Sequence, residues 1–522
     1  MDATNLRDKA LAATSEIDWY PSWAINRMRA MIEGRPDWCI SRQRSWGVPV
    51  PVFKCGKCGS TIATSATFDA VINLFEQHGA DAWYDRLPAA YLPEDTHCEV
   101  CKAGIADVLA ESDILDVWWE SGASHTSVLK ARDYLQFPAD LYLEGSDQHR
   151  GWFQSSLLTS VGAYDQAPYK AIMSCGFVND GDGNKMSKSK GNVIDPLKVM
   201  DTYGADILRL WVASIDYSQD VGIDNEILKR TSEAYRRIRN SFRFLLSNLY
   251  DFSYDDIVKW DQLHQLDRWA LARIMQISEQ TSASYEALRF HQVYHNLYDY
   301  LVTELSAVYM DALKDRLYSD AANSVQRRSA QTVLINILDV LVRQFAPILS
   351  FTCDEVFESY PKGLKRADHP DAIMLAQWYN VEKFLPQVPL NEYDTLLGEY
   401  QLVLTLREIV TKQLEEARGS KLIGKSQEAA IELRVDEDTA ITLGNLSANT
   451  LEELFIVASV TVVADASLAS VNEATAHVNA ASAEKCPRCW NIRELGSNSC
   501  YPNVCERCAN VLAALGFKEE TI

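Results

Sequence analysis

Cysteines in the spacing Cys-x-x-Cys are the residues of this chain whose chemistry is easiest to predict. The last two pairs are Cys486 with Cys489 and Cys505 with Cys508, and fifteen residues separate them. Two close pairs of thiolates suit a closed, tetrahedral structural zinc site, and this spacing is typical of one. We therefore predict a terminal zinc module. Cys500 lies between the pairs and is not expected to be a ligand.

A second set of cysteines could form another metal site nearer the start of the chain. Cys55 and Cys58 are followed, after thirty-nine residues, by Cys98 and Cys101. The first pair lies in a glycine-containing turn of the kind found in zinc knuckles. The gap is long, so the alternative is that the two pairs never meet. These four residues are a candidate zinc site.

A lysine-rich loop, Asn184–Asn192, reads NKMSKSKGN and follows a turn over residues 180–183. Lysines neutralise phosphate oxygens as point charges, while hydroxyl and backbone N–H groups donate hydrogen bonds to them. The loop could therefore close over a polyphosphate, with Lys185, Ser187 and Lys188 in contact with it. The alternative is a solvated surface turn, which is what most runs of charge form.

Polar residues also follow an apolar segment over residues 141–143, which we expect to be a strand. Glu144 would lie at its carboxyl end, and Asp147 and Gln148 at the start of a helix that begins near Ser146. In open α/β sheets, ligands bind in this crevice, where carboxylates suit a ribose diol or an ammonium group and a helix N-terminus suits an anion. An ordinary helix cap with a buried glutamate is the alternative. His149 is assigned no role.

Arginines recur on one face of a helix expected over residues 224–249. Arg236, Arg239 and Arg243 are spaced three and four residues apart, which places them together. Such a face suits a nucleic-acid phosphate backbone. Salt bridges to the acidic remainder of the protein are an equally good interpretation.

Composition narrows the class of protein. The chain has 522 residues, is 47% hydrophobic and carries a net charge of −22. This length predicts several domains, and the acidity argues against a generally basic nucleic-acid-binding surface. No apolar run is long enough to cross a bilayer, and the first residues do not form a signal peptide. We expect a cytoplasmic protein that does not bind membranes.

The hydrophobic pattern changes along the chain from mixed α/β to helical. Repeats at three and four residues predict an all-α bundle from about residue 224 to 360. Residues 361–395 are expected to be loop-like, and 467–484 to be a linker. The other expected elements are helices over 68–79 and 396–418 and strands over 171–177, 429–435 and 461–464.

Several longer motifs together resemble the C-terminal part of bacterial isoleucyl-tRNA synthetases, a class I aminoacyl-tRNA synthetase family. The resemblance runs from about residue 1 to 515. It rests on DWCISRQRSWGVPVP (Asp37–Pro51), LEGSDQHRGWF (Leu143–Phe153), NKMSKSKGN (Asn184–Asn192), GADILRLWVAS (Gly204–Ser214), APILSFTCDEVF (Ala346–Phe357) and EKCPRCW (Glu484–Trp490). The lysine loop alone indicates only class I.

The resemblance implies a multidomain protein with five parts. These would be a remnant of a connective region with the first cysteine set (1–110), the C-terminal half of a Rossmann-like α/β nucleotide-binding catalytic domain (111–223), a helical-bundle anticodon-binding domain (224–395), a small α+β junction module with a linker (396–480) and a zinc module (481–522).

The family makes isoleucyl-adenylate from L-isoleucine and Mg-ATP and then transfers the acyl group to tRNA(Ile). By motif, Glu144 would contact the adenylate, with Asp147 and Gln148 beside it. Lys185, Ser187 and Lys188 would bind ATP, the two lysines stabilising its phosphates during catalysis. Trp152 and Trp118 resemble the walls of the isoleucine pocket, and Arg236, Arg239 and Arg243 would bind tRNA. We expect a monomer.

The sequence departs from the family pattern in several places. Trp119 and Glu120 stand where the family usually has Phe and Asp, and Cys175 stands where it commonly has His. The N-terminal half, with its His-Ile-Gly-His motif, and the editing insertion are absent from the sequence. The expectation is a fragment that is inactive alone. The alternatives are a non-catalytic tRNA-binding zinc protein and the C-terminal subunit of a split synthetase, which would work with a missing N-terminal half.

Overall fold

The computed structural model describes residues 1–365, 370–378, 389 and 392–517. The chain divides into two compact units, which are described separately. Unit 1 comprises Met1–Asn179 and Tyr217–Val221, and unit 2 comprises Asp180–Asp216 and Gly222–Ile522. The chain crosses between the units three times: within β9 (Val178–Asp180), between Asp216 and Tyr217, and within β10 (Val221–Ile223). Parts of the expected loop 361–395 and of the terminal module lie outside the described residues.

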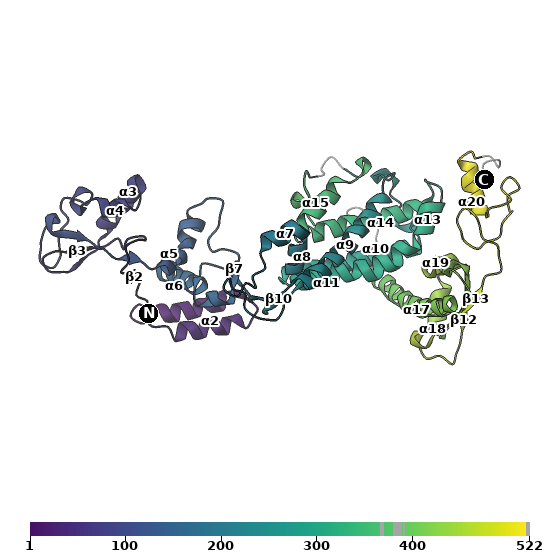
Figure 1. The fold of residues 1–522 in the computed structure, drawn as a ribbon, viewed down its shortest axis with the longest axis horizontal. Helices are drawn as coiled ribbons and strands as arrows, with labels where there is room; N and C mark the ends of the chain where they lie inside the picture. Colours follow the sequence, from purple (N-terminus) through teal and green to yellow (C-terminus); the bar gives the residue numbers. More distant parts are fainter. Residues whose placement is uncertain (366–369, 379–388, 390–391, 518–522) are drawn as a thin grey trace. The chain divides into compact units, whose positions relative to one another are not determined.

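A small parallel sheet lies within unit 1, where Figure 1 labels its strand β7. Its order is β1-β8-β7, from β1 (Asp18–Tyr20), β7 (Tyr142–Gly145) and β8 (Ala171–Cys175), so the middle strand is the last along the chain. Ile172 and Met173 of β8 are buried, as expected for an apolar strand covered by helices. The strands predicted over 141–143 and 171–177 are confirmed.

Helices pack on this sheet and enclose a common core with it. The core contains Met28, Ile32, Phe153, Leu157 and Ile172. The helices of this part are α1 (Leu6–Ala13), α2 (Ala24–Glu33), α5 (Val117–Gly122) and α6 (Trp152–Tyr164), and the short strands β2 (Ser41–Arg42) and β6 (Ile114–Leu115) pair near α5.

The helix predicted to begin near Ser146 begins instead at Trp152. Residues Ser146–His149 form one 3-10 turn, and α6 starts after Gly151. Gly151 has φ −110° and ψ −119°, a backbone conformation outside the helical region. Ser146 and Asp147 are good capping residues, but here the chain turns sharply before the helix starts. The carboxylates therefore lie on a loop after β7.

The first cysteine set belongs to a separate small subdomain of unit 1. Its strand β3 (Phe53–Cys55) pairs antiparallel with β4 (Thr61–Ile62) and β5 (Val108–Ala110). The predicted helix over 68–79 is confirmed as α3 (Ser65–His78), which Thr64 caps, and a short helix, α4 (Ala82–Asp85), follows. Phe53 and Trp83 pack at the centre, with ring centroids 5.0 Å apart.

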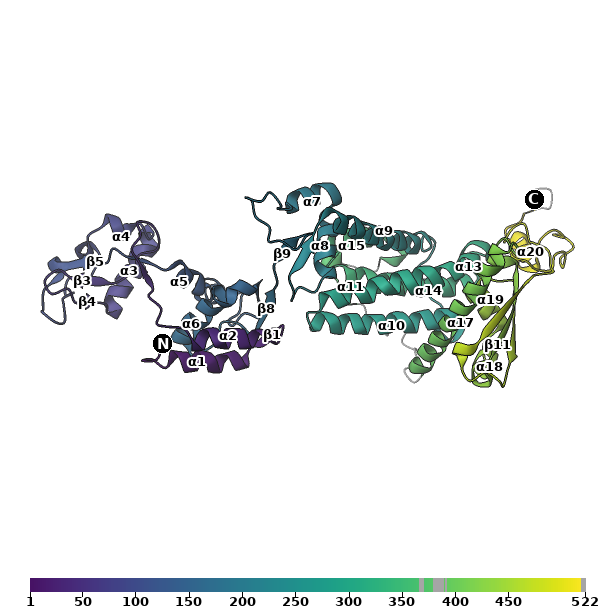
Figure 2. The same ribbon diagram turned by 60° about the horizontal axis from the view of Figure 1, so that its bottom comes forward.

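Unit 2 is mainly the predicted helical bundle, in which α10 packs against α11, α14 and α17 (Figure 2). The described helices are α7 (Pro196–Tyr203), α8 (Ala205–Ser214), α9 (Asn225–Ser247), α10 (Gln265–Glu286), α11 (Phe290–Asp299), α12 (Met310–Ala312), α13 (Lys314–Ser319), α14 (Val325–Phe345), α15 (Ser350–Glu358) and α17 (Tyr393–Gly419). Between α11 and α12, residues Tyr300–Tyr309 continue as a wider π-helix. Helix α14 is buried along most of its length, including several of its polar residues, so the bundle surrounds it on most sides.

A three-stranded module follows the bundle. Strand β11 (Ala429–Val435) pairs parallel with β12 (Ser459–Ala464) and antiparallel with β13 (Thr475–Ala480). The predicted linker 467–484 is therefore wrong in its middle, because β13 pairs with residues 429–434 of β11 despite its small and polar residues. Helices α18 (Glu437–Gly444) and α19 (Ala448–Phe455) lie between β11 and β12 in the chain, and α20 (Glu506–Ala514) belongs to the terminal cysteine module.

Within the described residues, no helix is both long and apolar enough to cross a membrane.

Candidate functional site

The polar residues after β7 lie in unit 1 as a short, mostly exposed loop. Glu144 is the last residue but one of β7 and accepts a hydrogen bond from the Gly145 N–H group at 3.0 Å. Asp147 is exposed, and its Oδ2 accepts from Gln148 Nε2 at 3.4 Å. Gln148 Oε1 also accepts from the backbone N–H of Trp152 at 2.9 Å, which joins the loop to the first turn of α6. The three predicted residues therefore lie close together at a strand end.

Two tryptophans form a wall beside this loop. Trp152 stacks on Tyr142 at 4.1 Å and 8°, and its Nε1 donates to Ser121 O at 2.9 Å. The ring of Trp118 rests against Gly151, where an added Cβ would lie 3.0 Å from the ring and 2.3 Å from Gln148 Oε1. Trp118 is 46% exposed, so part of its face is open to a ligand. Fixed aromatic faces next to polar groups suit an apolar side chain attached to a polar head.

Cys175 lies directly across from this loop, since it pairs with Gly145 in the sheet. Burial and the nearby charge of Glu144 raise the pKa of its thiol. The group is therefore a neutral thiol at neutral pH, and a weaker hydrogen-bond donor than the histidine expected from the family pattern.

His149 holds the loop, although it is assigned no role from the sequence. It is fully buried, and its Nδ1 lies 2.9 Å from Ser146 O. Burial lowers the pKa of its imidazole, which is therefore neutral and donates through Nδ1. Its ring stacks on Trp19 at 6.3 Å. A lone histidine in a polar motif carries no signal that would separate this positioning role from an exposed one.

The lysine loop belongs to unit 2. Lys185 and Lys188 are exposed, and Ser187 is half-buried at the apex. The Ser187 N–H group donates to Asn192 Oδ1 at 2.9 Å, and Asn192 Nδ2 donates to Asp180 Oδ2 at 2.8 Å. The loop therefore has side-chain hydrogen bonds that give it a fixed form, which a freely solvated turn would not need.

The terminal cysteines converge as predicted from their spacing. One sulfur atom from each of Cys486, Cys489, Cys505 and Cys508 lies within 4.8 Å of all the others, and all four residues are buried. Ligands at about 2.3 Å in a tetrahedron lie roughly 3.8 Å apart, and the Sγ atoms of Cys489 and Cys505 are 3.8 Å apart. The four thiols therefore fit a zinc ion, and Cys500 is exposed outside the group.

The first cysteine set also converges. The two pairs meet with Sγ–Sγ distances of 3.5 Å between Cys55 and Cys101 and between Cys58 and Cys98. The thirty-nine residues between the pairs form α3 and α4, which pack on β3 and return the second pair to the first. Cys55 and Cys98 are buried, whereas Cys58 and Cys101 are exposed. This donor set also fits a zinc ion.

Two arginines inside the terminal Cys-x-x-Cys pairs, which the sequence analysis missed, hold that module on the bundle. Arg488 Nη1 donates to Cys508 Sγ at 3.3 Å and to Ser319 O at 2.6 Å. Arg507 forms a two-pronged salt bridge with Asp315 at 2.6 and 2.8 Å. A sequence signal exists, because each arginine directly precedes the second cysteine of its pair.

The arginine face of α9 is partly occupied. Arg239 makes a two-pronged salt bridge with Glu355 of α15, at 2.7 and 2.8 Å. Arg236 and Arg243 are exposed on the same helix. The salt-bridge interpretation therefore holds for Arg239, while the other two remain candidates for phosphate contacts.

A cavity of about 880 Å³ lies where the bundle, the three-stranded module and the terminal cysteine module meet within unit 2. Its walls include Arg316, Lys425, Glu453, Trp490 and Arg493. Trp490 is 56% exposed, and the Nζ atom of Lys425 lies 4.9 Å from the centroid of its ring. The cavity therefore offers an aromatic face with cationic neighbours.

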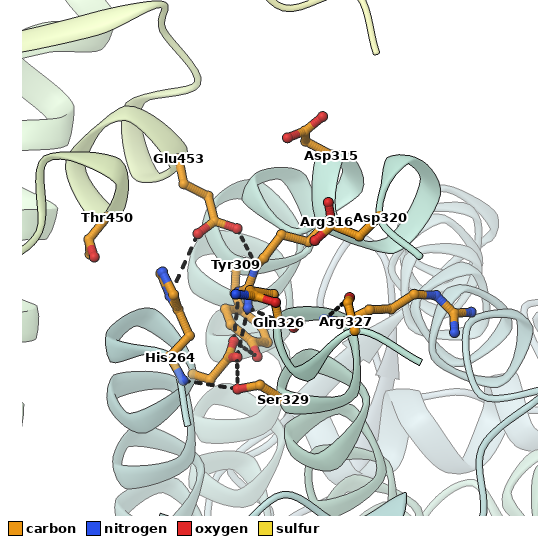
Figure 3. A network of polar contacts seen from close by, with 12 residues as sticks. His264, Tyr309, Asp315, Arg316, Asp320, Gln326, Arg327, Ser329, Thr450 and Glu453 are labelled. Atoms are coloured by element: carbon orange, nitrogen blue, oxygen red, sulfur yellow. Dashed lines mark hydrogen bonds and ion pairs between the residues drawn. The ribbon is translucent and has the colours of Figure 1, made fainter. Parts of the chain in front are cut away.

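Arg316 and Glu453, which line this cavity, belong to a buried ionic network (Figure 3). Arg316 donates two hydrogen bonds of 2.8 Å to Asp267 and a further one to Glu453 of α19. Tyr309 and Ser329 donate to the same Asp267 carboxylate, at 2.7 and 2.5 Å. The network therefore links the bundle helices α10, α13 and α14 to α19 of the three-stranded module.

Three family models match parts of the chain. The family model "tRNA synthetases class I (I, L, M and V)" matches residues 1–224, "Anticodon-binding domain of tRNA ligase" matches 267–433, and "Zinc finger found in FPG and IleRS" matches 483–511. A solved methionyl-tRNA synthetase of Mycobacterium tuberculosis, in complex with methionyl-adenylate, is 18% identical with a TM-score of 0.48, covering 67% of this chain and 60% of that one.

Curated relatives match nearly the whole chain. The isoleucine–tRNA ligase of Syntrophotalea carbinolica is 45% identical over 519 residues, which is 98% of this chain and 54% of that protein. The isoleucine–tRNA ligase of Natranaerobius thermophilus is 43% identical over 97% of this chain and 54% of its own length. The chain spans about half the length of these relatives. The class I model matches the start of the chain, and the zinc-finger model matches its end. The chain therefore belongs to the isoleucine–tRNA ligase family of class I aminoacyl-tRNA synthetases.

Proposed function

We propose that the chain takes part in the isoleucine–tRNA ligase reaction, in which ATP, L-isoleucine and tRNA(Ile) give isoleucyl-tRNA, AMP and diphosphate. The observation that carries the proposal is the tryptophan wall of Trp118 and Trp152 beside Glu144, Asp147 and Gln148. An isoleucine side chain fits an aromatic wall, and its ammonium group and the ribose of the adenylate fit the polar loop.

The residues act by positioning and by charge. Glu144, Asp147 and Gln148 would orient the adenylate, while Lys185, Ser187 and Lys188 would bind the phosphates of Mg-ATP. Both lysines are on exposed parts of their loop, where they can reach a ligand. Preorganised charges of this kind lower the barrier of phosphoryl chemistry without a protein nucleophile.

The helical and terminal parts would bind tRNA. We assign the anticodon-binding role to residues 224–395, with Arg236 and Arg243 on the phosphate backbone and Arg239 tied to Glu355 until RNA displaces it. The cavity beside Trp490 would receive an unstacked base, because single-stranded bases stack on aromatic side chains that have cationic neighbours. Zinc in one or both cysteine sets would be structural. A monomer in the cytoplasm remains our prediction.

Isoleucine-dependent exchange of label between diphosphate and ATP tests the catalytic proposal. We expect no exchange by the chain alone, because the relatives carry nearly half of their length outside the shared region. Adding the unshared part of the Syntrophotalea relative should restore exchange, and Lys188→Ala should abolish the restored activity. Lys190→Ala, in the same loop, is the matched control and should retain it.

Two outcomes would change this proposal: the first would overturn the expectation of a chain that is inactive alone, and the second the assignment of the chain to the ligase reaction. Robust exchange by the chain alone would show that the shared half is sufficient. Binding of tRNA without any exchange in the mixture would favour a non-catalytic tRNA-binding zinc protein.

A further inference from the structure

Two side chains close the stem of the lysine loop from opposite ends. Asp180 precedes the loop, Asn192 ends it, and Asn192 Nδ2 donates to Asp180 Oδ2 at 2.8 Å. The other end of the Asn192 amide, Oδ1, accepts the backbone N–H of Ser187 at 2.9 Å. One amide therefore connects the base of the loop to its apex. We call Asp180 and Asn192 the loop clasp.

The clasp is anchored at its base. The second carboxylate oxygen of Asp180 accepts the backbone N–H groups of Asn184 at 2.7 Å and Asp182 at 3.1 Å. The next residue, Gly181, lies so close to Asp224 that an added Cβ would be 2.5 Å from its carboxylate oxygen. Asp224 itself caps α9. The Asp180 carboxylate therefore sits at a fixed point between a tight turn and the first turn of a bundle helix.

Charge strengthens the clasp. The hydrogen bonds from Asn192 and the Asn184 backbone lower the pKa of Asp180 below its usual range, so the carboxylate is ionised at neutral pH. Hydrogen bonds to an ionised acceptor are roughly twice as strong as neutral ones. Glycines make the clasp necessary as well. Gly183 and Gly191 are both at positive φ, and the freedom of the glycine backbone means that neither residue by itself holds the loop in one conformation.

We propose that Asp180 and Asn192 are positioning residues that hold the lysine loop in the form in which it presents Lys185 and Lys188. What the lysines bind rests on the proposed function. The clasp itself does not, because it is defined by hydrogen bonds within residues 180–192. Opening of the clasp would release the Ser187 N–H group, which the Asn192 amide holds.

Limited trypsin digestion of the intact chain, with mass spectrometry of the cut sites, measures loop opening without any activity. Cleavage after Lys185, Lys188 or Lys190 requires the loop to leave its fixed form. Asn192→Asp sets two carboxylates against each other and should raise the cleavage rate at these sites on the order of tenfold. Asp180→Asn should raise it less. Asp182→Asn makes the same change of charge on the same turn without touching Asn192, and should leave the rate within about twofold.

A double variant in which Asp180 and Asn192 swap side chains gives the decisive test of the clasp. In Asp180→Asn/Asn192→Asp the donor and acceptor trade places, so the new Asp can still accept from Ser187 and the new Asn can still accept from Asn184. We expect slow cleavage to return in this double variant, together with slow hydrogen exchange at the Ser187 amide. If either single substitution acted only by destabilising the fold around it, the second substitution would not restore slow cleavage.

The remaining outcomes separate the clasp from the proposed function. In the reconstituted exchange assay, Asn192→Asp should lower kcat more than it raises the KM for ATP, and the double variant should recover. Variants that cleave like the unmodified chain, or a double variant that cleaves as fast as Asn192→Asp, would overturn the clasp. A clasp that behaves as expected while Lys188→Ala leaves exchange unchanged would instead overturn the assignment of the loop to ATP.

Discussion

At the scale of single residues, the contribution of a buried charge to the stability of the fold depends most on its hydrogen-bond and ion-pair partners. Arg316 and Asp267 are 5% and 0% exposed, yet every oxygen of Asp267 accepts at least one hydrogen bond. Glu453, from the neighbouring module, is the weakly satisfied member: its Oε2 makes no hydrogen bond with the described residues, and His264 Nδ1 lies 3.6 Å from it. Burial of a carboxylate without full compensation shifts its pKa and couples the site to pH.

The pair of Glu453 and His264 should give the bundle two opposite pH dependences. Burial raises the pKa of Glu453 to about 7, so the folded state keeps a proton that the unfolded state has lost, and stability falls as pH rises from about 4.5 to 7. Burial lowers the pKa of His264 to about 4, so stability rises as pH rises from about 4 to 6.5. In the unmodified chain, the effects of Glu453 and His264 on the free energy of unfolding have opposite signs and cancel over most of the range from pH 4.5 to 6.5.

Removal of either group should reveal the slope of the other. Glu453→Gln should leave a bundle whose free energy of unfolding increases from pH 4 to 6.5, and His264→Asn one whose free energy decreases from pH 4.5 to 7, each by at most about 3 kcal/mol. Urea unfolding at a series of pH values, followed by helical circular dichroism, measures both. His295→Asn, at an exposed histidine of α11, should change neither slope. Parallel curves for the two buried variants would contradict the assignment.

At the scale of elements, each cysteine module depends on metal and on what the module packs against. The terminal module has a small core of its own, formed by its cysteines with Tyr501, Val504 and Leu512. Such a core is too small to be stable without a crosslink, so metal binding supplies folding free energy. Arg488 and Arg507 then join the folded module to α13, through the Ser319 carbonyl and the Asp315 carboxylate.

Zinc content should follow the two cysteine sets. We expect two zinc ions per chain by mass spectrometry of the digested protein, one fewer in Cys505→Ser and one fewer in Cys98→Ser. Cys500→Ser and Cys39→Ser, at exposed cysteines outside the sets, are the controls and should keep both ions.

Docking of the module can be separated from its metal. Arg507→Ala should keep its zinc but increase hydrogen exchange in α13, because it removes the salt bridge to Asp315 and leaves the thiolates in place. An unchanged zinc content in Cys505→Ser would contradict the ligand set.

At the scale of the whole molecule, a net charge of −22 means that any RNA contact must be local. The cations that would supply it are distributed over a few surfaces, and many arginines of unit 2 are already paired, Arg239 among them. Binding should therefore depend on individual exposed cations and on salt.

Arg236→Ala and Arg243→Ala should each weaken binding of tRNA(Ile) several-fold and reduce the slope of log affinity against log salt by about 1. Arg239→Ala should do less, because its guanidinium must first leave Glu355. Arg418→Ala, at an exposed arginine of α17, is the control. Filter binding at several salt concentrations measures all four. An equal effect of Arg418→Ala would mean that the contribution is diffuse rather than carried by α9.

Local patterns in the sequence were sufficient for the long elements. Helix α9 follows directly from its apolar period and its Asp224 cap, and β11 from its alternation, because both signals lie within one segment. The start of α6 was not predictable, since a capping residue followed by a sharp turn looks the same in sequence as one followed by a helix. Strand β13 was missed because its pairing with β11, not its own composition, makes it a strand.

The sequence by itself determined the chemistry available: thiolates in pairs, carboxylates after a strand, and lysines in a loop whose order indicates the family. Only the tertiary structure decided which of these groups meet. It brought Cys55 and Cys58 to Cys98 and Cys101, tied Arg239 to Glu355, and set Asn192 between Asp180 and Ser187. The physical reason is that residue type and spacing fix what a side chain can do, whereas distances between segments far apart in the chain are fixed by packing.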